Sequence, residues 1–244
     1  MDRRTFLRAA GLMGLLPATS AWAFGRTNQL TFALLDTADE RSRRVAWKRL
    51  GLEVEARTSI TVVPQPLLVD GGSDAIFNYP LLICSGSGEL PAWSAQRWAR
   101  LAHYLRSGGM IIFDQAQEDD GFSKACLQRL ARQLPKGAQQ QLTKDHVLYR
   151  SFYLLETPVG RHLSAQQPQA ALVDGRMVAL ALEVDLAGSL LRDEFGAWAY
   201  PCNPGGEAQR EQAIRFGVNL LMYALCTDYK ADQVHIPFLL KRRR

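Results

Sequence analysis

The sequence lacks the motifs that would identify an enzyme directly. It contains no Gly-x-x-x-x-Gly-Lys-Ser/Thr phosphate loop and no Gly-x-Gly-x-x-Gly dinucleotide fingerprint. Its four histidines and four cysteines also stand without zinc-site or Cys-x-x-Cys spacing. We therefore expect no nucleotide cofactor and no metal.

Long hydrophobic runs are missing as well. A membrane-spanning helix needs about 20 apolar residues, and no stretch after residue 24 approaches this length. The N-terminal apolar run, Ala9–Ala18, is also too short, and two glycines interrupt it. A short apolar run behind basic residues is typical of an export signal rather than of an anchor.

The residues before that run match the twin-arginine export pattern Arg-Arg-x-Phe-Leu-Lys/Arg. Ala21-Trp22-Ala23 then supplies the small-x-small pattern of signal cleavage, which starts the mature chain at Phe24. The alternative is an ordinary secretory signal, and both routes lead out of the cytoplasm. We predict a twin-arginine signal over residues 1–23 and a periplasmic or other extracytoplasmic location. The residues that carry this prediction are Arg3, Arg4, Phe6, Leu7, Ala21 and Ala23.

Positive charge is in small excess, with a formal net charge of +5. Removal of residues 1–23, which hold three arginines and one aspartate, lowers the net charge to +3. Much of the remaining excess lies in the terminal run Lys241-Arg242-Arg243-Arg244. This tail either contacts an anionic membrane surface or an acidic partner, or is simply solvated. Nucleic acid is a poor candidate partner for an exported chain.

Cysteine is scarce, and four thiols that enter an oxidising compartment allow three disulfide pairings. Cys84 ends an apolar strand-like run, Cys126 and Cys226 lie on apolar helix-like segments, and the fourth is Cys202. A free cysteine behaves as a small hydrophobic residue in such surroundings. We expect buried free thiols, with disulfides as the alternative.

The sequence does contain an alternation of strand-like and helix-like segments. Strand patterns cover residues 29–36, 61–70, 80–88 and 110–115. Helix patterns cover residues 40–58, 94–109 and 119–134. Three strand–helix pairs predict a parallel, doubly wound sheet. The almost wholly apolar segment Met110–Gln115 is expected at its centre, because a strand covered on both faces is apolar throughout.

The pattern changes in the C-terminal half. Residues Pro135–Arg150 are polar and indicate an irregular segment. Residues 170–183 predict two strands joined by Asp174-Gly175, a strong hairpin signal, and residues 207–225 predict a long helix. We expect one α/β domain over residues 24–244, with a mostly parallel central sheet followed by a C-terminal hairpin and a long helix.

The first candidate binding loop is Ser85-Gly86-Ser87-Gly88, at the end of a predicted strand. Ligands of doubly wound sheets collect at the carboxyl ends of the strands, and glycine lets the backbone approach a ligand closely. A plain tight turn explains the two glycines equally well. The loop is not the nucleophile elbow of α/β hydrolases, because Ser85 occupies the place of its first glycine.

The second candidate is Asp114-Gln115. A carboxylate that ends an apolar strand needs a hydrogen bond or a ligand, so Asp114 is either functional or structural. The third candidate is Asp145-His146, in which His146 is a possible partner for Asp114 in catalysis. Such a pair works only when both groups reach one reacting atom.

Four segments in this order carry a family resemblance: "NYPLLICSGSGEL", "LAHYLRSGGMIIFDQ", "DHVLYRSFY" and "AIRFGVNLLMYALCTDYKADQVHIPFLL". The mature chain resembles the domain-of-unknown-function family 4159. That family is similar to the class I glutamine amidotransferase-like superfamily, so the resemblance implies a three-layer, flavodoxin-like fold. True amidotransferases carry a Gly-x-Cys-x-Gly elbow after the central strand. Here Asp114-Gln115 stands at that place, without a cysteine, and Gly86-Ser87-Gly88 replaces the family's usual Gly-His-Gly.

The resemblance also concerns partners, because genes of this family often lie beside genes for MoxR-type ATPases and von Willebrand factor A-like proteins. With the elbow cysteine missing, we expect an exported, non-catalytic binding or accessory module of the cell envelope with a protein partner. The alternative is a hydrolase that uses Asp114 in place of that cysteine.

Overall fold

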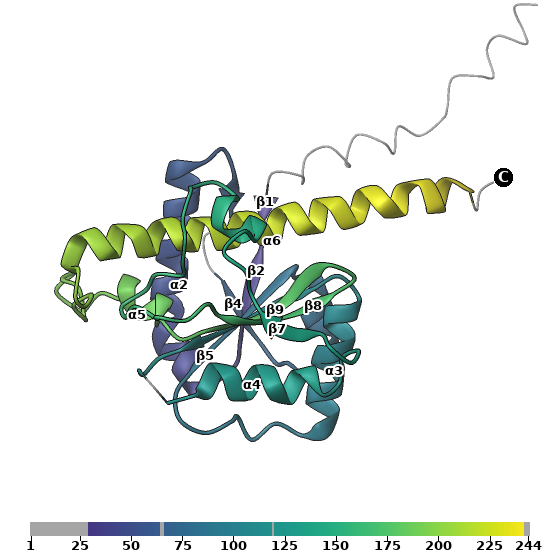
Figure 1. Cartoon of the computed structure of the whole chain (residues 1–244), viewed down its shortest axis with the longest axis horizontal. Helices are drawn as coiled ribbons and strands as arrows, with labels where there is room; N and C mark the ends of the chain where they lie inside the picture. Colours follow the sequence, from purple (N-terminus) through teal and green to yellow (C-terminus); the bar gives the residue numbers. More distant parts are fainter. Residues whose placement is uncertain (1–28, 64–65, 119, 242–244) are drawn as a thin grey trace, which may run out of the picture.

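A seven-stranded, mostly parallel β-sheet forms the middle of the molecule (Figure 1). The computed structural model describes residues 29–63, 66–118 and 120–241, and the expected signal over residues 1–23 lies outside these ranges. The strands run in the order β4-β2-β5-β6-β9-β8-β7. Their bounds are β2 Phe32–Leu35, β4 Leu67–Val69, β5 Leu81–Gly86, β6 Met110–Gln115, β7 Gln139–Gln141, β8 Gln169–Val173 and β9 Arg176–Leu182.

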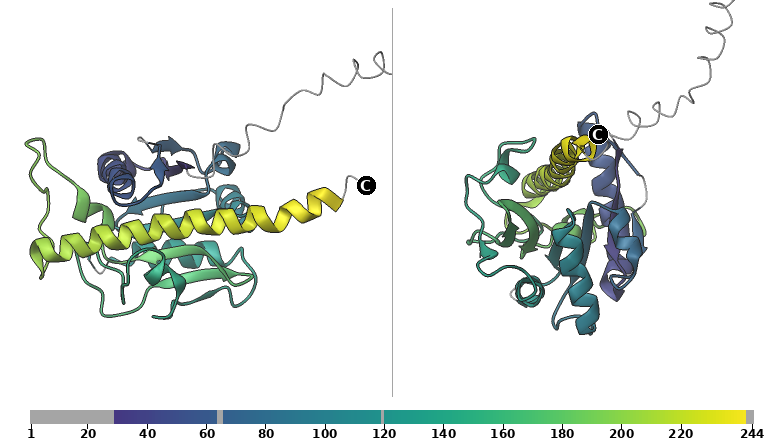
Figure 2. Two further views of the ribbon diagram at one scale, coloured as in Figure 1. Left: turned by 90° about the horizontal axis from the view of Figure 1, so that it is seen from above. Right: turned by 90° about the vertical axis from the view of Figure 1, so that its right-hand side faces the viewer.

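Helices cover both faces of the sheet and complete three layers (Figures 1 and 2). One hydrophobic cluster joins α3 and α4 to one face, and a second cluster joins α2, α5 and α6 to the other. The helix bounds are α2 Ala38–Arg57, α3 Ala95–Arg106, α4 Phe122–Ala131, α5 Leu186–Leu190 and α6 Gly206–Lys241. The predicted three-layer, flavodoxin-like α/β architecture is therefore confirmed.

Strand β6 is the fourth of the seven strands, so the prediction that Met110–Gln115 lies at the centre is confirmed. All residues of β6 and of its neighbour β5 are buried, as expected for strands covered on both faces. Successive side chains enter opposite layers. Ile112 packs with α2 and α6, whereas Phe113 packs with α3 and α4.

The predicted helices form where apolar residues recur regularly. Ser94 caps α3, as its side chain accepts a hydrogen bond from the backbone N–H of Arg97 at 3.2 Å. The apolar side of α3, which includes Trp98, Leu101 and Leu105, is buried against the sheet. Gly108 follows the helix with a φ of 112°, a conformation that suits glycine.

Two predicted segments differ from the structure. The strand predicted over residues 61–70, with a break at Pro64 and Pro66, forms two separate strands, β3 (Thr61–Val62) and β4. Of these, β3 leaves the main sheet and pairs in parallel with β1 (Gln29–Leu30). The segment Pro135–Arg150 is also not wholly irregular, because β7 extends the sheet edge and Val147–Arg150 forms the short helix η2. Pairing along an edge strand depends on its neighbour, which a polar sequence such as Gln139–Gln141 does not reveal.

The C-terminal hairpin and long helix are confirmed. Strands β8 and β9 pair antiparallel across Asp174-Gly175, both of which have positive φ, as a type I′ turn requires. Helix α6 is longer than predicted: it has 36 residues, about 54 Å at 1.5 Å per residue. It runs across the face of the sheet and projects beyond it (Figure 2). No helix in the described ranges has both the length and the apolarity to cross a bilayer.

Candidate functional site

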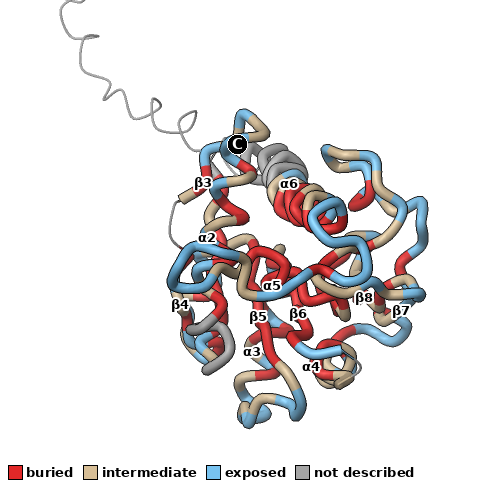
Figure 3. The backbone as a smooth tube through the Cα atoms, turned by 90° about the vertical axis from the view of Figure 1, so that its left-hand side faces the viewer, coloured by how far each residue is buried: buried red, intermediate tan, exposed pale blue. Residues whose placement is uncertain are grey.

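The structure brings the first two candidate groups together at the carboxyl end of the parallel strands. Strands β5 and β6 are neighbours, with Ser85 beside Asp114 and Gly86 beside Gln115. Figure 3 views the molecule from this end, where the buried helix α5 is surrounded by exposed loops. This end is where ligands collect in sheets of this kind.

Asp114 is completely buried at the end of β6. Its Oδ1 accepts a hydrogen bond from the backbone N–H of Leu186 at 2.8 Å, and its Oδ2 accepts one from Ala187 at 2.9 Å. Both donors lie in the first turn of α5, where N–H groups have no partner within the helix. Asp114 therefore joins α5 to the central strand.

Several charges act on the Asp114 carboxyl. Burial and the negative charge of Asp185 raise its pKa to about 7, whereas Arg43 and the two backbone N–H donors oppose this increase. Burial disfavours the ionised form because the carboxylate loses its water. The group therefore titrates near neutrality, although its oxygens are occupied by α5.

Asp185 is the second buried carboxylate at this end, and it lies three residues beyond the end of strand β9, immediately before α5. It has a left-handed backbone conformation, with a φ of 53°, and its Oδ1 accepts a hydrogen bond from the N–H of Gly188 at 2.9 Å. Its two carboxylate oxygens also form ion pairs with Arg43 of α2 and with Arg161. Arg161 donates a further hydrogen bond to the carbonyl of Ala116 at 3.1 Å.

Sequence reasoning missed Asp185, although a signal was present. It closely follows an almost wholly apolar strand, and a carboxylate in such surroundings needs a bonding partner, as Asp114 does. The distant arginines, 142 and 24 residues away in sequence, gave no such signal. They become neighbours because α2 and the loop before β8 meet over the end of β9.

Ser85 and Cys84 point to opposite layers of the sheet, as successive strand residues do. The Ser85 hydroxyl accepts a hydrogen bond from the indole Nε1–H of Trp47 in α2 at 3.2 Å. Cys84 instead packs in the cluster of α3 and α4. The serine thus lies in the same layer as Asp114, whereas the cysteine does not.

Within the Gly86-Ser87-Gly88 loop, Gly86 is buried, whereas Gly88 is exposed. A Cβ added to Gly86 would lie 2.4 Å from the ring of Phe122, so this ring covers the backbone that a ligand was expected to approach. Gly88 has a φ of 71°, and its N–H donates to Oδ2 of Asp120 at 2.8 Å. The expectation of a ligand at this loop stays a prediction.

Gln115 is also engaged internally. Its side-chain oxygen accepts hydrogen bonds from the backbone N–H and the hydroxyl of Ser123 in α4, at 3.4 and 3.3 Å. Its amide nitrogen donates to the carbonyl of Gln117 at 2.9 Å. Gln115 therefore connects β6 to α4, as Asp114 connects β6 to α5.

Asp145 and His146 lie elsewhere, at the other end of the same layer. His146 caps η2: its Nδ1 accepts a hydrogen bond from the backbone N–H of Leu148, and its ring lies 5.4 Å from the ring of Tyr223. The Tyr223 hydroxyl in turn accepts from the N–H of Met177, at the start of β9, whereas Asp114 pairs with Leu182 at its end. Five strand residues span about 17 Å, so the structure does not bring His146 to Asp114.

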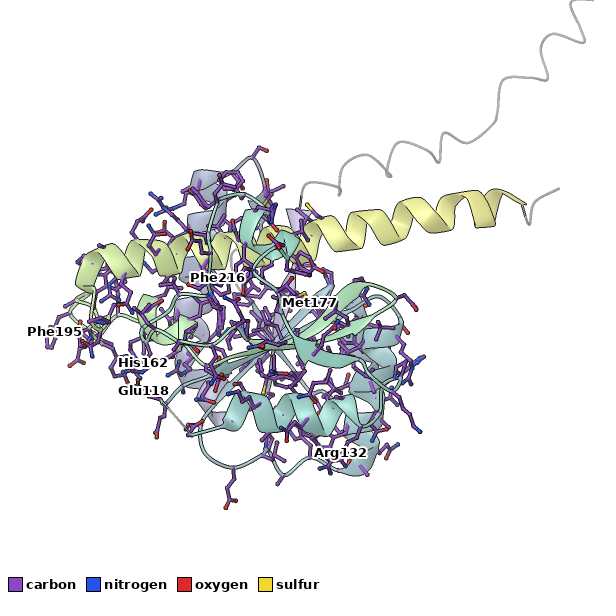
Figure 4. The ribbon with its side chains drawn as sticks, in the orientation of Figure 1. Glu118, Arg132, His162, Met177, Phe195 and Phe216 are labelled. Carbon is purple, nitrogen blue, oxygen red and sulfur yellow. The ribbon has the colours of Figure 1, made fainter. Side chains whose placement is uncertain are left out.

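A different histidine stands at the carboxyl end. His162 lies with Nδ1 3.4 Å from Oε2 of Glu118, in the loop that follows β6. Its backbone N–H donates to the carbonyl of Val184 at 3.0 Å. Figure 4 shows both side chains at the same end of the molecule as Phe195. Sequence reasoning missed this pair because nothing in the spacing relates residue 118 to residue 162.

Trp198 forms a further group at this end, in the loop between α5 and α6. Three guanidinium groups lie near its ring, with Cζ to ring-centroid distances of 5.0 Å for Arg49, 3.8 Å for Arg192 and 4.2 Å for Arg210. A fourth arginine, Arg161, lies 4.9 Å from the ring of Tyr200. We call Arg49, Arg192, Arg210 and Trp198 the Trp198 arginine cluster. Arginine stacking on aromatic rings is favourable by about 0.5–2 kcal/mol per contact.

All four cysteines lie in the described ranges, and none of them forms a disulfide there. Cys84, Cys126 and Cys202 are buried, as expected. The expectation was wrong for Cys226, which lies on α6 and is exposed. Burial raises the pKa of the Cys126 thiol and that of Cys202, so both stay in the unreactive protonated form. In the described residues, no three potential metal ligands come together.

The fold and this site define a mostly parallel, flavodoxin-like α/β protein whose central strand ends are bonded to its own helices. The chain belongs to the family described as "Domain of unknown function (DUF4159)", whose model matches residues 31–225. A search of curated proteins gives no match.

Proposed function

We propose that this chain is an exported, non-catalytic binding or accessory module of the cell envelope, with a fold of the class I glutamine amidotransferase-like type. The observation that carries this proposal is the state of Asp114. It stands where amidotransferases of this superfamily have their nucleophile, yet both of its oxygens accept backbone N–H groups of α5 and none of its surface is exposed. A nucleophile or general base must reach a substrate atom.

The alternative of a hydrolase built on Asp114 has less support. Its expected partner His146 lies at the opposite end of β9, and its own oxygens are engaged. Hydrolysis would therefore require both a rearranged α5 and another base. We retain this activity as the result that would overturn the proposal.

A protein partner is supported by an exposed apolar segment beside η2. Phe152 and Leu154 are 44% and 88% exposed, while the backbone N–H groups of Phe152 and Tyr153 donate to the side-chain oxygen of Asn219 in α6. The segment is thus held in place with its apolar side chains outward. Exposed apolar side chains held in this way are typical of protein contact sites. From the family resemblance, we propose a von Willebrand factor A-like protein as partner, with a MoxR-type ATPase in the same system.

Export is tested with the full-length chain and its Arg3→Lys, Arg4→Lys variant. We expect the natural chain in the periplasmic fraction and the variant in the cytoplasm, because the twin-arginine route requires both guanidinium groups. Equal export of both forms would contradict the twin-arginine assignment. A mature form that begins at Phe24, measured by mass spectrometry, would identify the cleavage site.

Partner binding is tested by native mass spectrometry of the mature chain recovered from the periplasm. We expect a complex with the von Willebrand factor A-like protein, weakened by the double variant Phe152→Ser, Leu154→Ser. The matched control is Leu67→Ser, which alters an exposed leucine on the edge strand β4. A monomer that turns over amide or ester substrates, with turnover lost in Asp114→Asn, would overturn the proposal.

A further inference from the structure

The Trp198 arginine cluster brings three positive charges together. Its three guanidinium groups come from α2, from the loop after α5 and from α6, so the fold assembles them around one indole ring. Stacking on the ring is favourable, but like charges at such distances repel one another. Their assembly therefore calls for negative charge nearby.

Glu207 supplies one negative charge, and it is used by Arg210. The Glu207 Oε1 accepts from Nε of Arg210 at 3.1 Å, and its Oε2 accepts from the indole Nε1–H of Trp198 at 3.1 Å. The remaining nitrogens of Arg210 donate to the carbonyls of Ser189 and Tyr200. Arg210 is therefore fully bonded within the protein, and it serves to hold the ring.

Arg49 and Arg192 are in a different condition. In both, the Nε atom is buried and has no hydrogen-bond partner among the residues that the structure describes. Neither guanidinium has a carboxylate within ion-pair distance in the described ranges, whereas Arg43 and Arg161 share Asp185. Arg192 has one hydrogen bond, to the carbonyl of Gly196. A buried donor without an acceptor costs about 1–3 kcal/mol, which an anionic oxygen at this place would recover.

We propose that Arg49 and Arg192 bind a phosphate group beside Trp198. The two unpaired guanidinium charges match a phosphate, which carries up to about two negative charges, and the planar fork of arginine fits its oxygens in pairs. The cluster lies at the carboxyl end of the sheet, where ligands of this architecture are found. This inference rests on the proposed function, because it names the ligand class of the binding module.

The phosphate is either free or part of a phospholipid headgroup, and the same two arginines would serve for both. Phe195 stands at the tip of the loop that carries Arg192 and Trp198, and it is 87% exposed. Figure 4 shows it at the outer edge of this end of the molecule. If the ligand is a phospholipid headgroup, this apolar side chain would enter the interfacial layer of the membrane and add to binding. If the ligand is free phosphate, the side chain would contribute nothing to binding.

The experiment titrates the mature chain with inorganic phosphate and follows the indole N–H resonance of Trp198 by NMR, with chloride at equal ionic strength as the reference salt. We expect a saturable shift with phosphate alone. Arg49→Gln and Arg192→Gln should each weaken the affinity about tenfold or more, since hydrogen bonds to charged groups contribute about 1.5–3 kcal/mol. The phosphate affinity of Arg192→Lys, which keeps the charge but loses the planar fork, should lie between that of the natural chain and that of Arg192→Gln. The control Arg132→Gln removes an exposed charge just beyond the C-terminal end of α4, at the other end of the molecule from Phe195 (Figure 4), and should leave the affinity unchanged.

A second arm measures co-sedimentation with phosphatidylcholine vesicles that contain or lack phosphatidylglycerol. If the chain binds the anionic vesicles, and Phe195→Ser and Arg192→Gln each abolish this binding, the ligand is a phospholipid headgroup. If the chain responds to inorganic phosphate but not to the vesicles, the ligand is free phosphate. Absence of any phosphate-specific response, or equal weakening by Arg132→Gln, would overturn the inference. In that case an intact partner complex in native mass spectrometry would show that the proposed function stands, and circular dichroism would show that each variant is folded.

Discussion

Replacement of Asp114 by asparagine tests the buried carboxyl that joins β6 to α5. The variant keeps the shape of the side chain but presents one acceptor and one NH2 group to the two N–H donors of Leu186 and Ala187. One of these donors then lacks an acceptor in a fully buried place. We expect a loss of about 1–3 kcal/mol in the free energy of unfolding under mildly acidic conditions.

The same variant should change the dependence of stability on pH. The pKa of Asp114 is higher in the folded chain, about 7, than its ordinary value of 3.8, so the folded state holds the proton more tightly. This contribution is fully present below about pH 4 and is lost as the pH rises to about 7. Its slope is at most about 1.4 kcal/mol per pH unit. The asparagine variant lacks the contribution, so its deficit should be larger at about pH 5 than at about pH 8.

The assay is urea unfolding of the natural chain and the variant across this pH range, with Asp145→Asn as the matched control. Asp145 has a side chain that is 98% exposed, so its replacement should leave the pH dependence unchanged. The reasoning would be refuted if the free energies of unfolding of the natural chain and of Asp114→Asn, plotted against pH, ran parallel from about pH 5 to about pH 8.

Three further predictions concern the core of the site and the thiols. Asp185→Asn should destabilise the fold by about 3 kcal/mol or more in thermal unfolding, because it leaves Arg43 and Arg161 without their shared carboxylate. The control Glu118→Gln changes a side chain that is 63% exposed and should change the stability little. Gly86→Ala should lower the free energy of unfolding by about 1–3 kcal/mol through its clash with Phe122. The additional change Phe122→Leu should recover part of this loss, and additive losses in the double variant would contradict a direct contact. A thiol reagent should label Cys226 in the native chain and the three buried cysteines only after unfolding, as measured by intact mass spectrometry, and rapid native labelling of Cys126 would contradict its burial.

The fold was predictable from sequence where local patterns carry the information. The apolar run of β6, the turn residues Asp174-Gly175 and the helical spacing around Trp98 each specify an element without reference to distant residues. The edge strand β7 and the pairing of β3 with β1 outside the main sheet were not predictable in this way. Their pairing depends on which neighbour lies alongside, and the polar residues of β7 show no alternation.

The site was predictable only in part, for a similar reason. Asp114 and Gln115 were identified because a polar residue at the end of an apolar strand has to be bonded. Asp185 lies three residues beyond an apolar strand and is bonded for a similar reason. Arg49 and Arg192 carry no such signal, because surface arginines on helices and loops are common. Their significance arises from the approach of α2 and α6 to one tryptophan, which is a property of the tertiary structure.

Helix α6 also has a mechanical consequence. It begins beside the Trp198 arginine cluster, through Arg210, and its far end projects beyond the other side of the sheet (Figure 1). The buried residues of this rod of about 54 Å run from Gln209 to Ala224, so its first half is packed on the sheet and its second half extends past it. A displacement of the sheet would therefore carry the projecting half of the helix with it.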